Sequence, residues 1–248
     1  MTITIVGDFA DHLSFLASQR AEHIRSLGLH QVRWLAVEAD RGRPVGGRPL
    51  DITDLDQVQR LAVPGEALPA AGIQVPNSRA ATAAYAESVT DGVPDVMRCA
   101  LFDALWVNGR NIGDPDVIRS IAFAVLNPLP PYGDIDWRIR ANLPIVPLGD
   151  PDPIATTRRL GFIVSMGRGP LTVSGQERLD EWRRFWEQHG MSELPLLLTD
   201  RGKALTGAHA LTWLAQQLPH RDAGTTSADA TVAIVDTTPQ HRWAAHLS

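Results

Sequence analysis

The chain has 248 residues, of which 44% are hydrophobic and 21% are charged, and its formal net charge is −5. This composition is ordinary for a globular protein, and the modest negative charge argues against nucleic acid or an anionic membrane surface as a partner. A single cysteine, Cys99, excludes an internal disulfide, a zinc knuckle and dithiol–disulfide exchange within the chain.

The sequence shows no pattern for targeting, membrane insertion or metal binding. The first residues run into an apolar segment without a preceding basic stretch, and no apolar stretch approaches the roughly 20 residues that span a bilayer. The eight histidines show no metal-ligand spacing. We therefore expect a soluble cytoplasmic protein with no membrane contact, no bound metal and no cofactor. No pattern sets the oligomeric state.

The N-terminal segment predicts a strand, a helix and a second strand. Residues 2–6 form a β-branched run, as expected for a buried strand. Asp11 is a good N-cap residue for the helix that follows, whose apolar residues recur at helical spacing until Gly28. Residues 32–37 predict the second strand, which a right-handed crossover makes parallel to the first.

Three helices are expected after an irregular loop. Residues 40–51 are rich in glycine, proline and arginine and predict the loop. Residues 79–88 are rich in alanine and predict the first helix, and two apolar helical patterns follow it. The starts of the three helices carry residues favoured at helix N-termini, namely Asn77 or Ser78, Pro94 and Asp114-Pro115.

The next segment begins with a long connector. Residues 127–153 contain seven prolines and no clear periodicity, so we expect them to be irregular. Residues 160–165 and 170–173 flank a glycine-rich stretch at residues 166–169, and this pattern favours either a small hairpin or a loop. Ser174 and Glu177 have the spacing of a capping box, which predicts the start of a helix that ends at Gly190.

The last part of the chain predicts a hairpin and a helix. Residues 194–199 and 204–206 are expected to pair as antiparallel strands around a tight turn, and residues 208–217 follow as a helix. The tail beyond Pro219 is polar, with one further candidate strand at residues 231–235.

The order of these elements predicts an α/β protein with a thioredoxin-like fold and an inserted α-helical subdomain. Residues 1–50 and 174–218 would form the thioredoxin-like core. Residues 51–173 would form the helical insertion with its proline-rich connector, and residues 219–248 a C-terminal extension.

Four segments carry a resemblance to a known family. The sequence resembles the DsbA-like branch of the thioredoxin superfamily over roughly residues 2–218. That branch includes polyketide-associated dithiol isomerases, 2-hydroxychromene-2-carboxylate isomerases and kappa-class glutathione transferases. The similar segments are residues 7–18, residues 76–81, residues 100–115, which look like the insertion helices of actinobacterial members, and Leu194-Pro195.

The chain departs from this family at the start of the first helix. Relatives carry Cys-x-x-Cys, Cys-x-x-Ser or Ser-x-x-Ser there, whereas this sequence has Asp11-His12-Leu13-Ser14. A thiolate site needs the positive helix N-terminus, which a carboxylate of Asp11 would already occupy. Two anions ~4 Å apart repel by about 4 kcal/mol at an effective dielectric of 20. We therefore expect a degenerate active site that does not support sulfur chemistry.

The resemblance also assigns roles to the residues at this position. Asp11 is either a structural N-cap or a carboxylate that binds a ligand, and His12 and Ser14 are the candidate catalytic residues. Pro195 falls where the superfamily has its cis-proline, and Leu194 before it would offer backbone groups to a ligand. We take Asp11, Leu194 and Pro195 as candidate substrate-binding residues.

Three functions stay open. The first is a non-redox small-molecule-binding protein or enzyme, of unknown ligand, that uses the cleft between the core and the helical insertion. The second is a non-catalytic protein-interaction module, suggested by Asp11 and by the tryptophans Trp182 and Trp186 at helical spacing. The third, a disulfide oxidoreductase, follows from family membership alone. Cys99 lies inside a predicted helix and is expected to be an inert apolar side chain.

Overall fold

The structure is a computed structural model, and it describes residues 2–126, 172–191 and 193–219. The chain divides into a compact unit, Met1–Leu218, and a second unit, Pro219–Ser248. Several expectations fall outside the described residues: the connector at 127–153, most of the segment at 160–173, the C-terminal extension beyond Pro219 and the candidate strand at 231–235.

A four-stranded mixed sheet forms the centre of the Met1–Leu218 unit. Its strands are β1 (Thr2–Gly7), β2 (Gln31–Ala36), β5 (Leu196–Thr199) and β6 (Ala204–Thr206), in the spatial order β2-β1-β5-β6. β1 pairs with β2 in parallel, and β5 pairs with both β1 and β6 in antiparallel fashion. The expected parallel pair and C-terminal hairpin are therefore confirmed.

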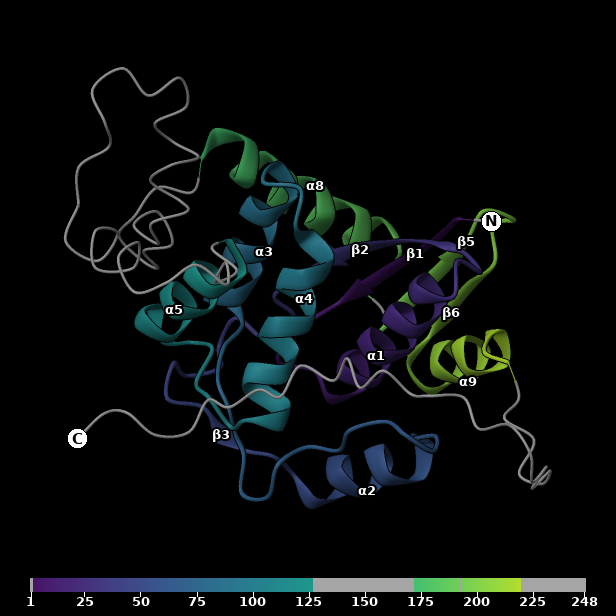
Figure 1. The fold of residues 1–248 in the computed structure, drawn as a ribbon, viewed down its shortest axis with the longest axis horizontal. Helices are drawn as coiled ribbons and strands as arrows, with labels where there is room; N and C mark the ends of the chain where they lie inside the picture. The colour runs from purple at the N-terminus through teal and green to yellow at the C-terminus, as the bar shows by residue number, and fades with distance from the viewer. Residues whose placement is uncertain (1, 127–171, 192, 220–248) are drawn as a thin grey trace, which may run out of the picture. The chain divides into compact units, whose positions relative to one another are not determined.

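Helices cover both faces of this sheet (Figure 1). α1 (His12–Ser26) connects β1 to β2, and it packs beside α9 (Gly207–Gln217) on one face. α8 (Val173–Gln188) lies over the other face. Gly7, at the end of β1, sits so close to the Trp34 indole that an added Cβ would overlap the ring, so only glycine fits there.

The helical insertion follows β2 and packs against the same core. It contains α3 (Arg79–Thr90), α4 (Pro94–Phe102), a turn of π-helix at Asp103–Val107 and α5 (Pro115–Leu126). The three expected helices are confirmed. α3 packs on α8 and α4 packs on α1, so the insertion contacts helices from both faces of the sheet.

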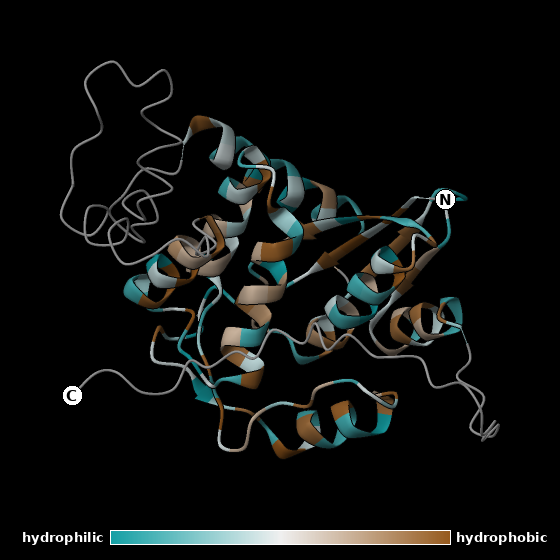
Figure 2. Cartoon of the chain, in the orientation of Figure 1, coloured by the Kyte–Doolittle hydropathy of each residue, from teal (hydrophilic) through white to brown (hydrophobic). Residues whose placement is uncertain are grey.

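Aromatic side chains join the insertion to the core. The rings of Phe9, Phe15 and Phe102 lie in one buried cluster, and the Phe15 ring stacks on Trp106 at a centroid distance of 5.8 Å. The indole Nε1 of Trp106 donates a hydrogen bond to the Phe9 carbonyl at 2.9 Å. Figure 2 shows hydrophobic residues along the central strands of the sheet and a mixture of hydrophobic and hydrophilic residues on the helices.

Additional structure lies at the end of the expected loop, residues 40–51, and in residues 52–76, for which no element was predicted. A short antiparallel pair, β3 (Arg48–Pro49) with β4 (Gln74–Val75), encloses α2 (Ile52–Leu61), which the sequence interpretation missed. Asp51 caps α2 by accepting the backbone N–H of Thr53 at 2.9 Å. The helix packs against α1 and α9, which supply the apolar partner that its sequence alone did not reveal.

The expected capping box at the start of α8 is wrong. The N-cap is Thr172, whose hydroxyl accepts the Gly175 N–H at 3.1 Å. Thr172 is held in turn by the buried carboxylate of Glu87 on α3, which accepts its backbone N–H at 2.8 Å. This contact between distant segments places the N-cap two residues before Ser174, and the local Ser174–Glu177 pattern does not set the helix start.

Candidate functional site

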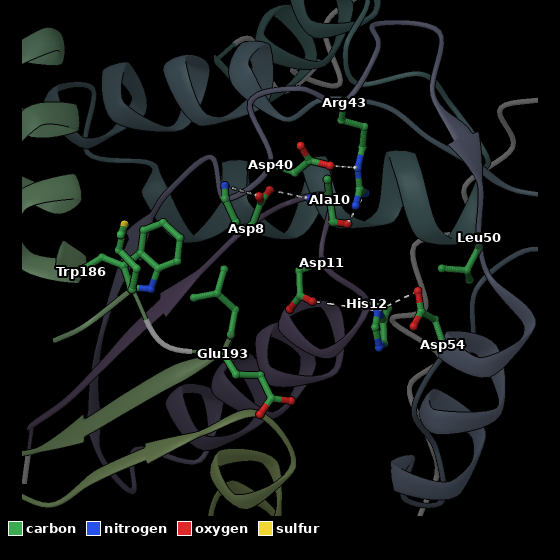
Figure 3. A pocket seen from close by; sticks show the side chains of 13 residues that line it. Asp8, Ala10, Asp11, His12, Asp40, Arg43, Leu50, Asp54, Trp186 and Glu193 are labelled. Atoms are coloured by element: carbon green, nitrogen blue, oxygen red, sulfur yellow. Dashed lines mark hydrogen bonds and ion pairs between the residues drawn. The ribbon is translucent and has the colours of Figure 1, made fainter.

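A cavity of about 390 Å³ opens beside the N-terminus of α1. It lies where five segments meet: the β1–α1 loop, the loop after β2, the start of α2, the end of α8 and the residues before β5 (Figure 3). Its volume falls within the range of sites that bind small molecules. The lining residues lie in loops and near the ends of helices, so the packing of these elements forms the cavity.

Asp11 caps α1 at the edge of this cavity. Its backbone is extended, and its Oδ2 accepts the Ser14 backbone N–H at 2.6 Å, as an N-cap does. Burial raises the pKa of Asp11 from 3.8 to about 6, while the neighbouring His12 and hydrogen bonds from Ser14 oppose this increase. About 23% of the side chain stays exposed, so the carboxyl is open to the cavity.

His12, the first residue of α1, lies between two carboxylates and an amide. Its Nε2 is 3.0 Å from Oε1 of Gln57, which can accept the imidazole hydrogen. Its Nδ1 lies 3.9 Å from Asp11 and 3.9 Å from Asp54, and both ion-pair contacts are drawn in Figure 3. α2 supplies Asp54 and Gln57, so this helix orients the imidazole at the cavity wall.

Asp8 lies in the β1–α1 loop and lines the inner part of the cavity. Its two carboxyl oxygens accept the backbone N–H groups of Ala10 at 2.8 Å and Ala39 at 2.7 Å. Burial raises the pKa of Asp8 above its ordinary value, although these hydrogen bonds and the nearby Arg43 favour the charged form. Asp8 thus ties the β1–α1 loop to the segment after β2 and sets the position of Asp11.

Ser14 lies beneath the cap, one turn into α1. The side chain is fully buried, and its hydroxyl accepts the backbone N–H of Asp8 at 3.3 Å. Ser14 does not line the cavity, whereas its neighbours Asp11 and His12 do. The structure therefore brings His12 and Asp11 together at the cavity and places Ser14 behind them.

The two remaining candidate residues directly precede β5, and of the two only Leu194 lines the cavity. The Leu194–Pro195 peptide bond is cis, as expected from the sequence. Leu194 lines the cavity together with its neighbour Glu193, while Pro195 is buried and its carbonyl accepts the Gly207 N–H at 3.0 Å. Leu194 is therefore beside the space available to a ligand, and Pro195 shapes the turn into β5.

The sequence interpretation missed most of the charged residues of the cavity. The missed residues are Asp8, Asp40, Arg43, Asp54 and Glu193. They come from segments between the predicted elements, and no spacing in the sequence links them. One usable signal did exist in the apolar residues Leu55, Val58 and Leu61 after Asp51, because they recur at helical spacing and would have placed Asp54 on a helix.

Cys99 lies on α4, outside the cavity lining. Its Sγ is 3.8 Å from Oε2 of Glu22, and burial raises the pKa of the thiol. A thiol that resists ionisation is a poor nucleophile.

Metal and membrane features can be judged for the residues that the structure describes. Within these ranges, no three His, Cys, Asp or Glu side chains lie where they could hold a metal ion together. No helix in the described part of the chain is both long and apolar enough to cross a membrane.

Comparisons with solved structures identify the fold. No family model matches the chain, and no curated protein matches it by sequence. A probable DsbA oxidoreductase from Streptomyces coelicolor matches with a TM-score of 0.57 and 16% identity, over 87% of each chain. A 2-hydroxychromene-2-carboxylate isomerase matches with a TM-score of 0.54 and 17% identity, over 87% of this chain and 93% of the isomerase.

A third similar structure is the cytosolic disulfide reductase DsbM from Pseudomonas aeruginosa with GSH. It matches with a TM-score of 0.51 and 16% identity, over 87% of this chain and 96% of DsbM. These identities are low, so the matches describe architecture and do not transfer an activity. The chain has the DsbA-like thioredoxin fold, an α/β core with an inserted helical subdomain.

Proposed function

We propose that this protein is a non-redox small-molecule-binding protein or enzyme that uses the cavity beside α1. The observation that carries the proposal is the carboxyl group of Asp11, which caps α1 at the edge of a cavity of about 390 Å³. The family resemblance implies a cysteine or serine at this position in the DsbA-like branch. Here the same position offers a proton-exchanging group in place of a group that holds a thiolate.

Charge at the helix tip argues against sulfur chemistry at this site. The N-terminus of a helix carries about half a positive charge, which stabilises a thiolate in redox proteins. Asp11 already accepts the Ser14 N–H with its carboxylate. A substrate thiolate ~4 Å from that carboxylate would be disfavoured by about 4 kcal/mol at an effective dielectric of 20. The only cysteine of the sequence, Cys99, lies outside the cavity lining.

The residues at the cavity support proton transfer or ligand orientation instead. With a pKa of about 6, Asp11 can both hold and release a proton near neutral pH. The His12 Nδ1 lies 3.9 Å from the Asp11 carboxylate. The backbone N–H of Ser14 donates a hydrogen bond to the Asp11 carboxylate, and we assign Ser14 a positioning role. Leu194 would contact the ligand from the cavity wall.

Ligand screening by thermal shift tests this proposal. The panel contains thiols including glutathione, thioethers, aromatic carboxylates and amines. A39W would place an indole in the cavity wall, and A71W would place one in an exposed loop outside the cavity. We expect at least one class to raise the melting temperature of the wild type and of A71W but not of A39W. A panel without effect on the wild type, or equal effects on both variants, would contradict the proposal.

The interaction-module hypothesis loses one of its supports. Trp182 and Trp186 are both buried, and the Trp182 ring lies 5.5 Å from Tyr85 within the core. The tryptophan pattern on α8 therefore reflects packing. Pull-down from native lysate still separates the hypotheses, because a stoichiometric protein partner without any bound small molecule would favour the module.

The oxidoreductase hypothesis has a direct assay. We expect insulin reduction at background rates for both the wild type and C99A, because no cysteine lies at the tip of α1. Turnover above background in the wild type that is lost in C99A would show that Cys99 carries thiol chemistry, and it would overturn this expectation. We also propose a cytoplasmic location, in keeping with a chain that cannot form an internal disulfide.

A further inference from the structure

The cavity lining is strongly acidic. Five carboxyl groups line it, from four different segments: Asp8, Asp11, Asp40, Asp54 and Glu193. The lining contains one arginine, Arg43, and no lysine. The sequence as a whole has a net charge of only −5 over 248 residues, so negative charge is concentrated at this cavity. A concave site lined by one sign of charge focuses the field and attracts the opposite charge.

Arg43 does not provide a binding site for an anion. Its Nη1 donates a hydrogen bond to the Ala10 carbonyl at 3.0 Å, and its Nε lies 3.5 Å from the Asp40 carboxylate (Figure 3). Two negative or partly negative groups therefore already compensate its charge. An entering carboxylate or thiolate would have to compete with both, while facing Asp11 and Glu193 across the cavity.

Apart from His12, whose Nδ1 lies 3.9 Å from both Asp11 and Asp54, the rest of the lining is apolar. Leu50, Trp186, Met191 and Leu194 contribute to the cavity walls, and Figure 3 shows the Trp186 side chain on the α8 side, across the cavity from Leu50. Such walls suit the hydrocarbon part of a ligand, and an indole adds a surface that attracts cations. A bare inorganic cation would gain nothing from these walls.

We propose that the cavity binds an organic cation, with its ammonium group among the carboxylates of Asp11, Asp54 and Glu193 and its apolar part against Leu50 and Leu194. This inference rests on the proposed function, since it names the ligand class of the same cavity. It also separates this protein from a relative whose structure holds GSH, a peptide thiol with two carboxylate groups.

An isosteric series of probes tests the charge directly. Phenethylamine, phenethyl alcohol and 3-phenylpropionate have similar apolar parts and carry a positive, a zero and a negative charge at neutral pH. Binding is measured by titration calorimetry, or by ligand-observed NMR where it is weak. We expect phenethylamine to bind about tenfold more tightly than the alcohol, and the acid to bind weakest, because several carboxylates act on the same ammonium group. Added salt should weaken amine binding only.

Charge-neutralising variants localise the effect. D54N and E193Q each remove one carboxylate from the lining, and we expect each to weaken phenethylamine binding about three- to tenfold, with little effect on the alcohol. The matched control is D116N, which removes a carboxylate from the exposed side of α5, outside the lining. D116N should bind the amine like the wild type.

The outcomes distinguish this inference from the proposed function. Equal binding of amine and alcohol, tighter binding of the acid, or equal weakening by D116N would overturn the cation inference while leaving a small-molecule site in place. A series in which no probe binds the wild type overturns the inference as well. If, in addition, no compound of the thermal-shift panel raises the melting temperature of the wild type, the proposed function is contradicted as well.

Discussion

Replacing Asp11 with asparagine should stabilise the protein at neutral pH. Asparagine caps a helix about as well as aspartate does, so the hydrogen bond from the Ser14 N–H can be kept. The substitution removes a charge that burial destabilises, since the pKa of Asp11 rises from 3.8 to about 6 in the folded protein. D11N therefore separates the capping role of this residue from its charge.

The size of the effect follows from the pKa. A shift from 3.8 to about 6 corresponds to at most about 3 kcal/mol of unfolding free energy for the ionised group. About 23% of the side chain is exposed, and a neutral acceptor bonds the Ser14 N–H less strongly than a carboxylate does. We expect D11N to gain about 1–2 kcal/mol at pH 7.5, which is about 2–8 °C in melting temperature for a domain of this size.

The gain should depend on pH in a defined direction. The folded state holds the Asp11 proton more tightly than the unfolded state, so this residue stabilises the fold most below about pH 4. That contribution is lost as the pH rises through about 6. The asparagine side chain of the D11N variant does not titrate, so the difference in unfolding free energy between D11N and the wild type should be smallest near pH 4 and largest above pH 7.

Asp51 provides the matched control, because it also caps a helix with a carboxylate. Hydrogen bonds from the backbone and side chain of Thr53 lower the pKa of this exposed residue. D51N should therefore lose stability relative to the wild type at pH 7, and the loss should shrink as the pH falls. Circular dichroism during urea denaturation at several pH values gives both differences. A D11N variant less stable than the wild type at pH 7.5, or a D11N gain independent of pH, would refute the reasoning.

Three further predictions concern packing and the thiol. R20A should cost about 3–5 kcal/mol in urea denaturation, because Arg20 is buried and bonds the Glu66 carboxylate at 2.6 Å, which would be left without its partner; a cost below 1 kcal/mol would contradict this. W106F should cost about 1–2 kcal/mol in the same assay through the lost bond to the Phe9 carbonyl, and an unchanged midpoint would argue against that bond. Cys99 should react with iodoacetamide more slowly than a free thiol at pH 8 and at the ordinary rate in urea, because burial raises its pKa; fast labelling of the folded protein would disprove this.

The sheet and most helices could be predicted because their patterns are local. β1 is a short β-branched run, and α1 begins at a good cap residue and ends near Gly28, which has a φ of 65°. The insertion helices likewise start at Pro94 and Pro115, where proline is favoured. In each case the residues that define the element lie within that element.

The features that were missed depend on contacts between distant segments. α2 packs on α1 and α9, and its sequence pattern is short, because Leu55, Val58 and Leu61 recur at helical spacing within a helix of only ten residues. The start of α8 is set by Glu87, which is 85 residues from Thr172 along the chain. Neither contact could be read from the local sequence, because each requires the fold to be known first.

The candidate site divides in the same way. Asp11, His12 and Leu194 were found because the family resemblance marks their positions, and all three line the cavity. Asp54 and Glu193 were not found, because the first lies on the unrecognised helix and the second precedes the cis-proline without any motif of its own. The acidity of the site is a property of the assembled fold.

Helix capping alone does not account for Asp11. Serine, asparagine and aspartate cap helices with similar effect, so an uncharged residue would satisfy the Ser14 N–H without the cost of burying a charge. The carboxyl at this position lies near the buried Asp8 carboxyl, which raises its pKa further. Such an arrangement is typical of residues that act on a ligand, where stability is lower than the fold permits. If D11N bound phenethylamine as tightly as the wild type, the charge would have no role in binding, and this argument would fail.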